Sequence, residues 1–137
     1  DHQDLHSFPT RRSSDLLLYE TSRVVDIEIG LNKTIENPDS SSEAVKEAKA
    51  ELRKIKRIAA MLTPMSKYYC SEMSNTVAYD AIQVLGGSGF MRDYPCERHA
   101  RDARITTIYE GTSQLQCVAA VRGVCGGTFE KYITVLA

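Results

Sequence analysis

Apolar residues between positions 16 and 31 recur at the spacing of one helical face, and Glu20, Arg23 and Asp26 occupy the opposite side. The pattern predicts one long helix. It ends before Asn37-Pro38, because proline cannot continue a helix and restrains the residue before it. The apolar positions of this helix are Leu17, Leu18, Val24, Val25, Ile27, Ile29 and Leu31.

A second helix is predicted to begin at one of the serines of residues 40–42 and to run to Leu62. Its other side carries five basic residues, which alternate with glutamates. We interpret them as a solvated helix face, although a binding patch is the alternative. The apolar positions are Leu52, Ile55, Ile58, Ala59 and Leu62, and the basic ones are Lys46, Lys49, Arg53, Lys56 and Arg57.

Thr63-Pro64 is typical of a helix start, because threonine accepts hydrogen bonds from early backbone N–H groups and proline suits the first helical position. We therefore expect a third helix after it, which ends at Gly86-Gly87, where one glycine adopts the left-handed conformation of a helix cap. One face of this helix is predicted to be core. That face consists of Tyr69, Met73, Val77, Ala81 and Val84.

The remaining sequence predicts a short helix through Arg98–Ala103, a helix from Thr112 to about Arg122 that Gly123 and the later glycines end, and a further element over Phe129–Leu136. No alternating apolar and polar run typical of a strand is found. The predicted fold class is therefore all-α, an antiparallel helical bundle with short connections.

Composition narrows the range of partners. The 137 residues suffice for one modest core, and a formal net charge of −1 gives no global field that would attract nucleic acid or an anionic membrane. No apolar run approaches the roughly 20 residues of a membrane span. The four cysteines lie far apart, so we expect reduced, mostly packed thiols and neither a disulfide framework nor a metal site. They are Cys70, Cys96, Cys117 and Cys125.

The opening residues stand apart from the rest. Residues 7–16 resemble the translation of a widely used DNA sequencing adapter, so we expect residues 1–15 to be non-native and the native reading to begin near Leu16. The domain expected from this is residues 16–123, followed by the start of a further helical region over residues 124–137.

Three groups of residues suggest chemistry. The glycines of residues 86–89 could let backbone N–H groups approach a phosphate, but the preceding run is helical, so a cap and turn is the simpler interpretation. Glu110 is a candidate catalytic carboxylate. Because it stands just before Gly-Thr-Ser at a predicted helix start, the simpler interpretation is that its charge stabilises the helix N-terminus. The third group is a cluster of three arginines and one aspartate at the predicted short helix. It could bind phosphate, but its mixed charge favours an ion-pair network. It consists of Arg98, Arg101, Asp102 and Arg104.

Four motifs follow one another within the run from Asn75 to Arg122. They are Gln83-Val-Leu-Gly-Gly-Ser-Gly-Phe90, Tyr94-Pro-Cys-Glu-Arg98, Arg101-Asp-Ala-Arg104 and Ile108-Tyr-Glu-Gly-Thr-Ser-Gln-Leu-Gln116. Together they resemble the C-terminal region of the flavin-dependent acyl-CoA dehydrogenases. Cys117–Arg122 and Gly126–Lys131 look like the longer members of that family, which carry an additional C-terminal helical region.

The resemblance implies a site. It implies that Glu110 is the base that removes the α-proton of an acyl-CoA thioester while a hydride passes from the β-carbon to flavin N5, giving the 2-enoyl-CoA. Gly111 would lie at the thioester, and Tyr109 would either wall the substrate slot or fill core. We expect an apolar slot around Glu110. The residues implied to bind FAD are Gln83, Val84, Leu85, Gly86, Gly87, Thr112, Ser113 and Gln114.

The resemblance also implies partners. They are an acyl-CoA substrate, electron-transfer flavoprotein as acceptor, and further copies of the chain in a homodimer or homotetramer, with a cytoplasmic or mitochondrial-matrix location. Because it covers only the last helical domain of the family, we expect the chain alone to be inactive. The alternative is a non-catalytic helical interaction module on the same scaffold.

Overall fold

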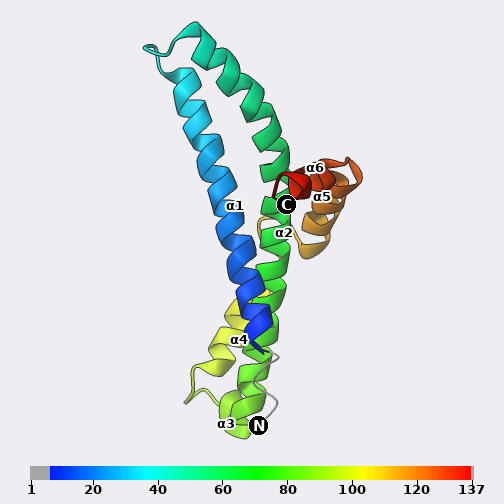
Figure 1. The fold of residues 1–137 in the computed structure, drawn as a ribbon. Helices are drawn as coiled ribbons and strands as arrows, with labels where there is room; N and C mark the ends of the chain where they lie inside the picture. Colours follow the sequence, from blue (N-terminus) through cyan, green and yellow to red (C-terminus); the bar gives the residue numbers. More distant parts are fainter. Residues whose placement is uncertain (1–6, 137) are drawn as a thin grey trace. The chain divides into compact units, whose positions relative to one another are not determined.

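The structure is a computed structural model that describes residues 7–136. All regular structure in this range is helical, so the predicted all-α class is confirmed. Part of the predicted non-native stretch, residues 1–6, lies outside the described residues. The helices are α1 (Ser7–Glu36), α2 (Ser42–Leu85), α3 (Gly87–Phe90), α4 (Cys96–Ile105), α5 (Ser113–Cys125) and α6 (Thr128–Leu136) (Figure 1).

The contacts group the chain into two compact units. Unit 1 comprises the residues up to Ser66 together with those from Ala119 onward, and unit 2 comprises Lys67–Val118. Helix α2 therefore contributes its first half to unit 1 and its second half to unit 2. Within the described residues, no helix combines the length and the apolar character that a membrane span requires.

A tight turn joins α1 to α2 in unit 1, where the sequence predicted the break (Figure 1). The Asn37 side-chain oxygen accepts from the Asp39 N–H at 3.0 Å, which is the local bond that favours asparagine in turns. The Ser41 hydroxyl oxygen then accepts from the Ala44 N–H at 3.2 Å and caps α2. The predicted serine start of the second helix is thus confirmed.

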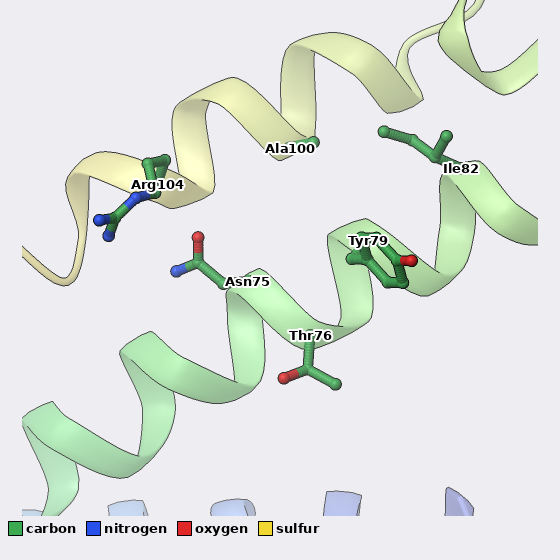
Figure 2. A pocket seen from close by; sticks show the side chains of 6 residues that line it. All are labelled: Asn75, Thr76, Tyr79, Ile82, Ala100 and Arg104. Atoms are coloured by element: carbon green, nitrogen blue, oxygen red, sulfur yellow. The ribbon is translucent and has the colours of Figure 1, made fainter.

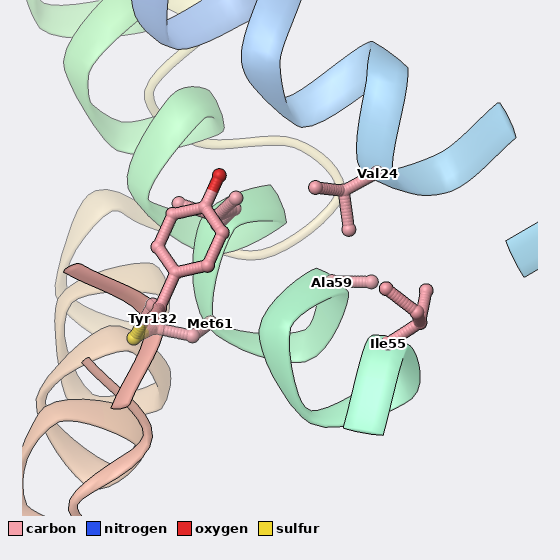
Figure 3. Close-up of a cluster of buried hydrophobic side chains, with 6 residues drawn as sticks. Val24, Ile55, Ala59, Met61 and Tyr132 are labelled. Carbon is pink, nitrogen blue, oxygen red and sulfur yellow. The ribbon is translucent and has the colours of Figure 1, made fainter. Parts of the chain in front are cut away.

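The core of unit 1 lies where α1, the first half of α2 and α6 meet (Figure 3). Met61 is 0% exposed and Val24 1% exposed, and they are the largest fully buried side chains among the described residues. The five basic residues predicted to be solvated on α2 are all exposed, which confirms that interpretation. The buried cluster consists of Val24, Ile55, Ala59, Met61, Leu62 and Tyr132.

Pro64 corrects one prediction. The sequence predicted a new helix at Thr63-Pro64, but α2 runs through this position as a single helix of 44 residues. An interior proline removes one backbone hydrogen bond and crowds the preceding turn. Pro64 itself is buried, as are Met61 and Leu62 just before it. Burial on the core side therefore offsets the missing hydrogen bond, a long-range effect that local helix signals do not report.

In unit 2 the second half of α2 turns a different face inward from the one predicted. Of the apolar stripe expected in the core, Val77 and Val84 are 60% and 85% exposed. The other three residues, Tyr69, Met73 and Ala81, are only partly buried. The inward face instead carries Ser71, Asn75 and Ala78, of which Ser71 and Ala78 are buried. Through this face α2 forms a side-chain hydrogen bond to the backbone of α4.

Side chains of α2 bond directly to the C-terminal end of α4. The Asn75 amide donates to the Ala103 carbonyl at 3.0 Å, and the hydroxyls of Ser74 and Thr106 are 3.3 Å apart. Carbonyls at the end of a helix lack partners within the helix and need such donors. Asn75 and Ser74 therefore stabilise the end of α4 through contacts made across unit 2.

Glycines at the C-terminal end behave differently from the prediction. Gly123 does not end α5, which continues to Cys125, and a Cβ at Gly123 would lie 2.8 Å from Met61 Cβ. Glycine is needed there for close packing in unit 1. The break comes at Gly127, whose φ is +72°, and α6 confirms the element predicted after it.

Candidate active site

A short loop between α4 and α5 holds the Tyr-Glu-Gly-Thr motif. The Ile105 carbonyl accepts from the N–H groups of Ile108 and Tyr109, at 2.9 and 3.1 Å. The Ser113 N–H donates to the Thr107 carbonyl at 3.0 Å, and Thr107 is buried. The loop is therefore closed at its base by backbone hydrogen bonds.

Glu110 lies in this loop in an unusual backbone conformation. Its φ is +54°, and among the described residues no other non-glycine residue has a positive φ. Left-handed backbone costs a non-glycine residue about 1–3 kcal/mol and persists where the surroundings enforce it, often at functional sites. Gly111, which follows with a φ of +94°, adopts its conformation without that cost.

The carboxylate of Glu110 is exposed and forms no hydrogen bond or ion pair within the described part of the chain. The apolar slot that we expected around it is therefore not formed by these residues. The N–H groups of Glu110 and Gly111 likewise donate to no acceptor there. A carboxylate and two backbone donors are thus free at the same bend of the loop.

Two side chains of α2 hold the ends of the loop. The Lys67 ammonium donates to the Thr106 carbonyl, and it also lies 4.4 Å from the centroid of the Tyr109 ring. At the other end, the Ser113 hydroxyl donates to the Glu72 carboxylate. Tyr109 is half exposed, so its ring serves as a platform for Lys67 and does not fill core.

Thr112, Ser113 and Gln114, which the resemblance implies to bind FAD, form different contacts at the start of α5. Thr112 caps the helix, since its hydroxyl oxygen lies 3.4 Å from the Leu115 N–H. The Ser113 hydroxyl is engaged with Glu72, whereas the side chain of Gln114 is exposed. The capping contact of Thr112 is compatible with the FAD contact that the resemblance implies for the same residue.

The Gln83–Gly87 segment at the end of α2 is exposed throughout. Gly86 has a φ of +59°, as a chain reversal there requires, but its ψ of −139° is not that of the predicted left-handed helix cap. A Cβ built at Gly86 or Gly87 would meet no atom within 4 Å. The backbone at these glycines is therefore open to a large flat group, and the segment fits the implied contact with a flavin dinucleotide.

Gly89 lies beneath these open glycines and is buried. A Cβ at this position would meet the Ile82 carbonyl oxygen at 2.7 Å and Leu85 Cβ at 3.0 Å. The predicted loop therefore turns back onto α2 as the short helix α3. Only a residue without a side chain allows this contact.

The two parts of the implied site, the Glu110 loop and the Gly86-Gly87 turn, lie at different positions along α2. Ser113 contacts Glu72, and α2 rises by about 16 Å from Glu72 to Gln83, which lies 11 positions further along the helix. Within one copy of the chain, the Glu110 loop and the Gly86-Gly87 turn therefore do not converge on the same small group.

An open hollow of about 570 Å³ lies between α2 and α4 in unit 2 (Figure 2). The Asn75 amide at its edge is already used by the carbonyls of Ser71 and Ala103. Among the residues singled out by sequence, Arg104 alone reaches this hollow. Its lining consists of Asn75, Thr76, Tyr79, Ile82, Ala100 and Arg104.

The arginines of α4 do not form the predicted ion-pair network. In the described residues, Arg101 lies 4.0 Å from Glu97 one helical turn away, and Arg104 donates to the Thr107 hydroxyl. Most of these side chains point into solvent, where separate charges gain little from pairing.

The predicted thiol packing holds only in part, since Cys117 and Cys125 are exposed.

Comparison with known proteins accounts for the loop and the glycine turn together. The family profile described as "Acyl-CoA dehydrogenase, C-terminal domain" matches residues 40–125, more than half of the chain. The chain belongs to this family. The match contains both the Gln83–Gly87 segment and the Glu110 loop of this acyl-CoA dehydrogenase C-terminal domain.

Curated relatives give the same picture. An acyl-CoA dehydrogenase of Bacillus subtilis (strain 168) is 45% identical over 64 residues, which are 47% of this chain and 17% of the relative. The human mitochondrial short-chain specific enzyme is 54% identical over 52 residues, 38% of this chain and 13% of the relative. The pig mitochondrial long-chain specific enzyme is 43% identical over 65 residues, 47% of this chain and 15% of the relative. The matches thus span less than a fifth of these relatives and include names of both chain-length classes.

Proposed function

We propose that this acyl-CoA dehydrogenase C-terminal domain supplies the base of a flavin-dependent α,β-dehydrogenation, and that the base is Glu110. The observation that supports the proposal most is the conformation of Glu110, an exposed carboxylate without a partner among the described residues, on backbone that costs energy to maintain. A carboxylate needed only to favour a helix N-terminus would not require positive φ.

In the proposed reaction the Glu110 carboxylate takes the α-proton of the acyl-CoA thioester. Negative charge then develops on the thioester carbonyl oxygen, and the free N–H groups of Glu110 and Gly111 are suited to donate to it. A positioned base typically contributes about 10²–10⁴-fold in rate. FAD, when bound, supplies the oxidising power and takes up the hydride from the β-carbon.

The residues proposed to hold FAD form two sets. The open turn of Gly86 and Gly87, with the exposed side chains of Gln83–Leu85 before it, offers backbone and apolar surface to a dinucleotide. Thr112 and Gln114 form the second set, and we give Ser113 a supporting part because its hydroxyl is bonded to Glu72. The two sets lie about 16 Å apart along α2, so they would contact distant parts of one dinucleotide or two different flavins, as in the homodimer or homotetramer that we propose.

Electron-transfer flavoprotein is the proposed electron acceptor. One relative that is 45% identical over 67 residues is named as subunit CarC of a caffeyl-CoA reductase-Etf complex of Acetobacterium woodii, which supports this choice.

The cytoplasmic or mitochondrial-matrix location remains a prediction, as do the domain bounds of residues 16–123 and 124–137. Because the described residues form no slot around Glu110, we expect the chain alone to lack activity.

The test replaces Glu110 by glutamine in a longer protein that joins this chain to the remaining parts of an acyl-CoA dehydrogenase. Glu110→Gln should retain FAD and lower the dehydrogenation rate by at least about 100-fold. Glu47→Gln, at an exposed position in the first half of α2, is the matched control and should leave the rate unchanged. A rate for Glu110→Gln within tenfold of wild type would refute the assignment.

The alternative function is a non-catalytic interaction module. The exposed apolar side chains of unit 2 favour it, with Val84 85% and Phe90 75% exposed. The two functions differ in a simple observation. A longer protein that assembles stably but takes up no FAD would support the interaction module and exclude the dehydrogenase.

A further inference from the structure

The backbone of Glu110 is held by one side chain of the following helix. Gln116 Nε2 donates to the Glu110 carbonyl oxygen at 2.9 Å, reaching back over six residues. The amide passes close to Gly111, where a Cβ would lie only 2.6 Å from Nε2. The Gln116 backbone N–H donates to the Thr112 carbonyl at 3.0 Å, so the residue is itself fixed in the first turn of α5.

The Gln116 bond acts on the part of Glu110 that determines where its carboxylate points. The Cβ of a residue is attached to the backbone, so a change of φ from +54° to the usual negative range would swing the whole side chain. The carbonyl belongs to the peptide plane between Glu110 and Gly111. Because this carbonyl follows the N–Cα bond of Glu110, a change of φ would carry it away from Gln116 Nε2, so the hydrogen bond opposes the exit of Glu110 from the left-handed region.

We infer that Gln116 is a positioning residue for Glu110: its amide hydrogen bond to the Glu110 carbonyl holds residue 110 in the left-handed conformation that aims the carboxylate. The inference rests on the proposed function where it concerns catalysis, whereas the backbone effect stands on the structure alone. One hydrogen bond shifts a conformational equilibrium by about 2- to 12-fold. That range sets the size of the expected effect.

The first test uses nuclear magnetic resonance on the 137-residue chain. A positive φ places the amide proton close to the α-proton of the same residue, which gives a strong intraresidue nuclear Overhauser effect (NOE). Gln116→Met keeps the length of the side chain but removes the donor, and the NOE at Glu110 should weaken. Gln116→Lys restores a donor and should restore the NOE.

Thr34→Val is the matched control, because Thr34 also donates from an exposed side chain to a backbone carbonyl, that of Gly30 at 3.1 Å in α1. It should leave the Glu110 signal unchanged. A Gln116→Met chain with the wild-type NOE at Glu110 would overturn the inference. So would a weakened NOE that Gln116→Lys does not restore, since that outcome assigns the effect to packing and not to the hydrogen bond.

The second test measures kinetics in the longer protein. Gln116→Met should lower kcat by about 2- to 12-fold at unchanged KM and unchanged FAD content. A purely structural role would instead reduce FAD content together with activity, and that result would overturn the catalytic part. If Glu110→Gln keeps full activity, the proposed function fails, but the NOE of the Gln116 variants still decides the backbone inference.

Discussion

The ammonium group of Lys67 lies over the ring of Tyr109, 4.4 Å from its centroid, and donates to the carbonyl of Thr106 at the same time. Both contacts join the second half of α2 to the residues immediately before Glu110. A single cation on a rigid helix therefore fixes the entrance of the loop, while Glu72 fixes its exit through Ser113.

Replacing Lys67 by methionine removes both contacts and keeps the apolar stem of the side chain. We expect the free energy of unfolding to fall by about 2–4 kcal/mol, the combined size of a half-exposed cation–π contact and a charged hydrogen bond. Chemical denaturation measures this change. Lys54→Met is the control, since Lys54 forms only an exposed pair with Glu51 at 3.3 Å and should change stability by under about 0.5 kcal/mol. Equal effects of the two substitutions would show that Lys67 does not fix the entrance of the loop.

Glu110→Gly should raise the stability of the chain. Glycine adopts a φ of +54° without the steric cost that glutamate bears, so we expect a gain of about 1 kcal/mol in the free energy of unfolding. Glu47→Gly, inside α2 and exposed, should instead lose about 1 kcal/mol, because glycine weakens a helix interior. Thermal denaturation of both variants gives the two signs. A loss at position 110 would mean that the backbone there is not strained.

Gly89→Ala should destabilise unit 2 by about 1–3 kcal/mol, because the new methyl group would press on the Ile82 carbonyl oxygen. Gly87→Ala is matched to it, two residues earlier in α3 with open space at its Cβ position. It should be within about 0.5 kcal/mol of wild type or slightly more stable. The midpoint of urea denaturation distinguishes them, and a tolerated Gly89→Ala would show that α3 does not pack as described.

The acid stability of unit 1 should depend on Glu20. The hydrogen bond from Arg23, with a smaller contribution from its charge, holds the pKa of the Glu20 carboxyl below its ordinary value despite some opposing desolvation. Because the pKa is depressed in the folded state, the stabilisation is present above the unfolded pKa, about 4.3, and is lost as pH falls through the folded pKa. The Tyr132 hydroxyl also donates to this carboxylate and links α6 to α1.

The prediction is that Glu20→Gln lowers the Tm at pH 7, and that the difference from wild type shrinks as the pH falls below the unfolded pKa toward pH 3. Arg23→Met, which removes the main donor, should reproduce the same dependence on pH. Thermal denaturation between pH 3 and pH 7 measures both variants. A Tm difference that stays constant over this range would show that the ionised Glu20 carboxylate contributes nothing to stability.

Short-range signals in the sequence were sufficient for several elements of the fold. Asn37 and Ser41 act within a few residues of themselves, by closing a turn and capping a helix, so their neighbours in the chain predict them. The Glu110 motif is also local. Its placement before α5 and the capping by Thr112 follow from residues that adjoin one another.

Contacts between distant residues decided what the sequence did not predict. Burial around Pro64 carries α2 through a residue that locally favours a new helix. In unit 2, the Asn75 bond to the Ala103 carbonyl turns a small polar face inward and leaves the more apolar stripe of Val77 and Val84 outside. Periodicity identifies a face but does not identify which neighbouring backbone needs donors.

The positive φ of Glu110 could not be predicted from the sequence either. Glutamate has no preference for that region, and the conformation depends on Gly111 and on the bond from Gln116 six residues later. The motif therefore indicated the residue that we propose as the base, and the structure adds the hydrogen bond that we infer to set its direction.

The close approach of Gly89 to α2 has a consequence for inherited variation. Every missense change in a glycine codon introduces a residue with a Cβ, so no missense change at this position is conservative in shape. Alanine and serine, the mildest replacements at most surface positions, would already press on the Ile82 carbonyl oxygen. Natural variants should therefore be depleted at Gly89 and tolerated at Thr34 or Glu47, whether or not position 89 takes any part in chemistry.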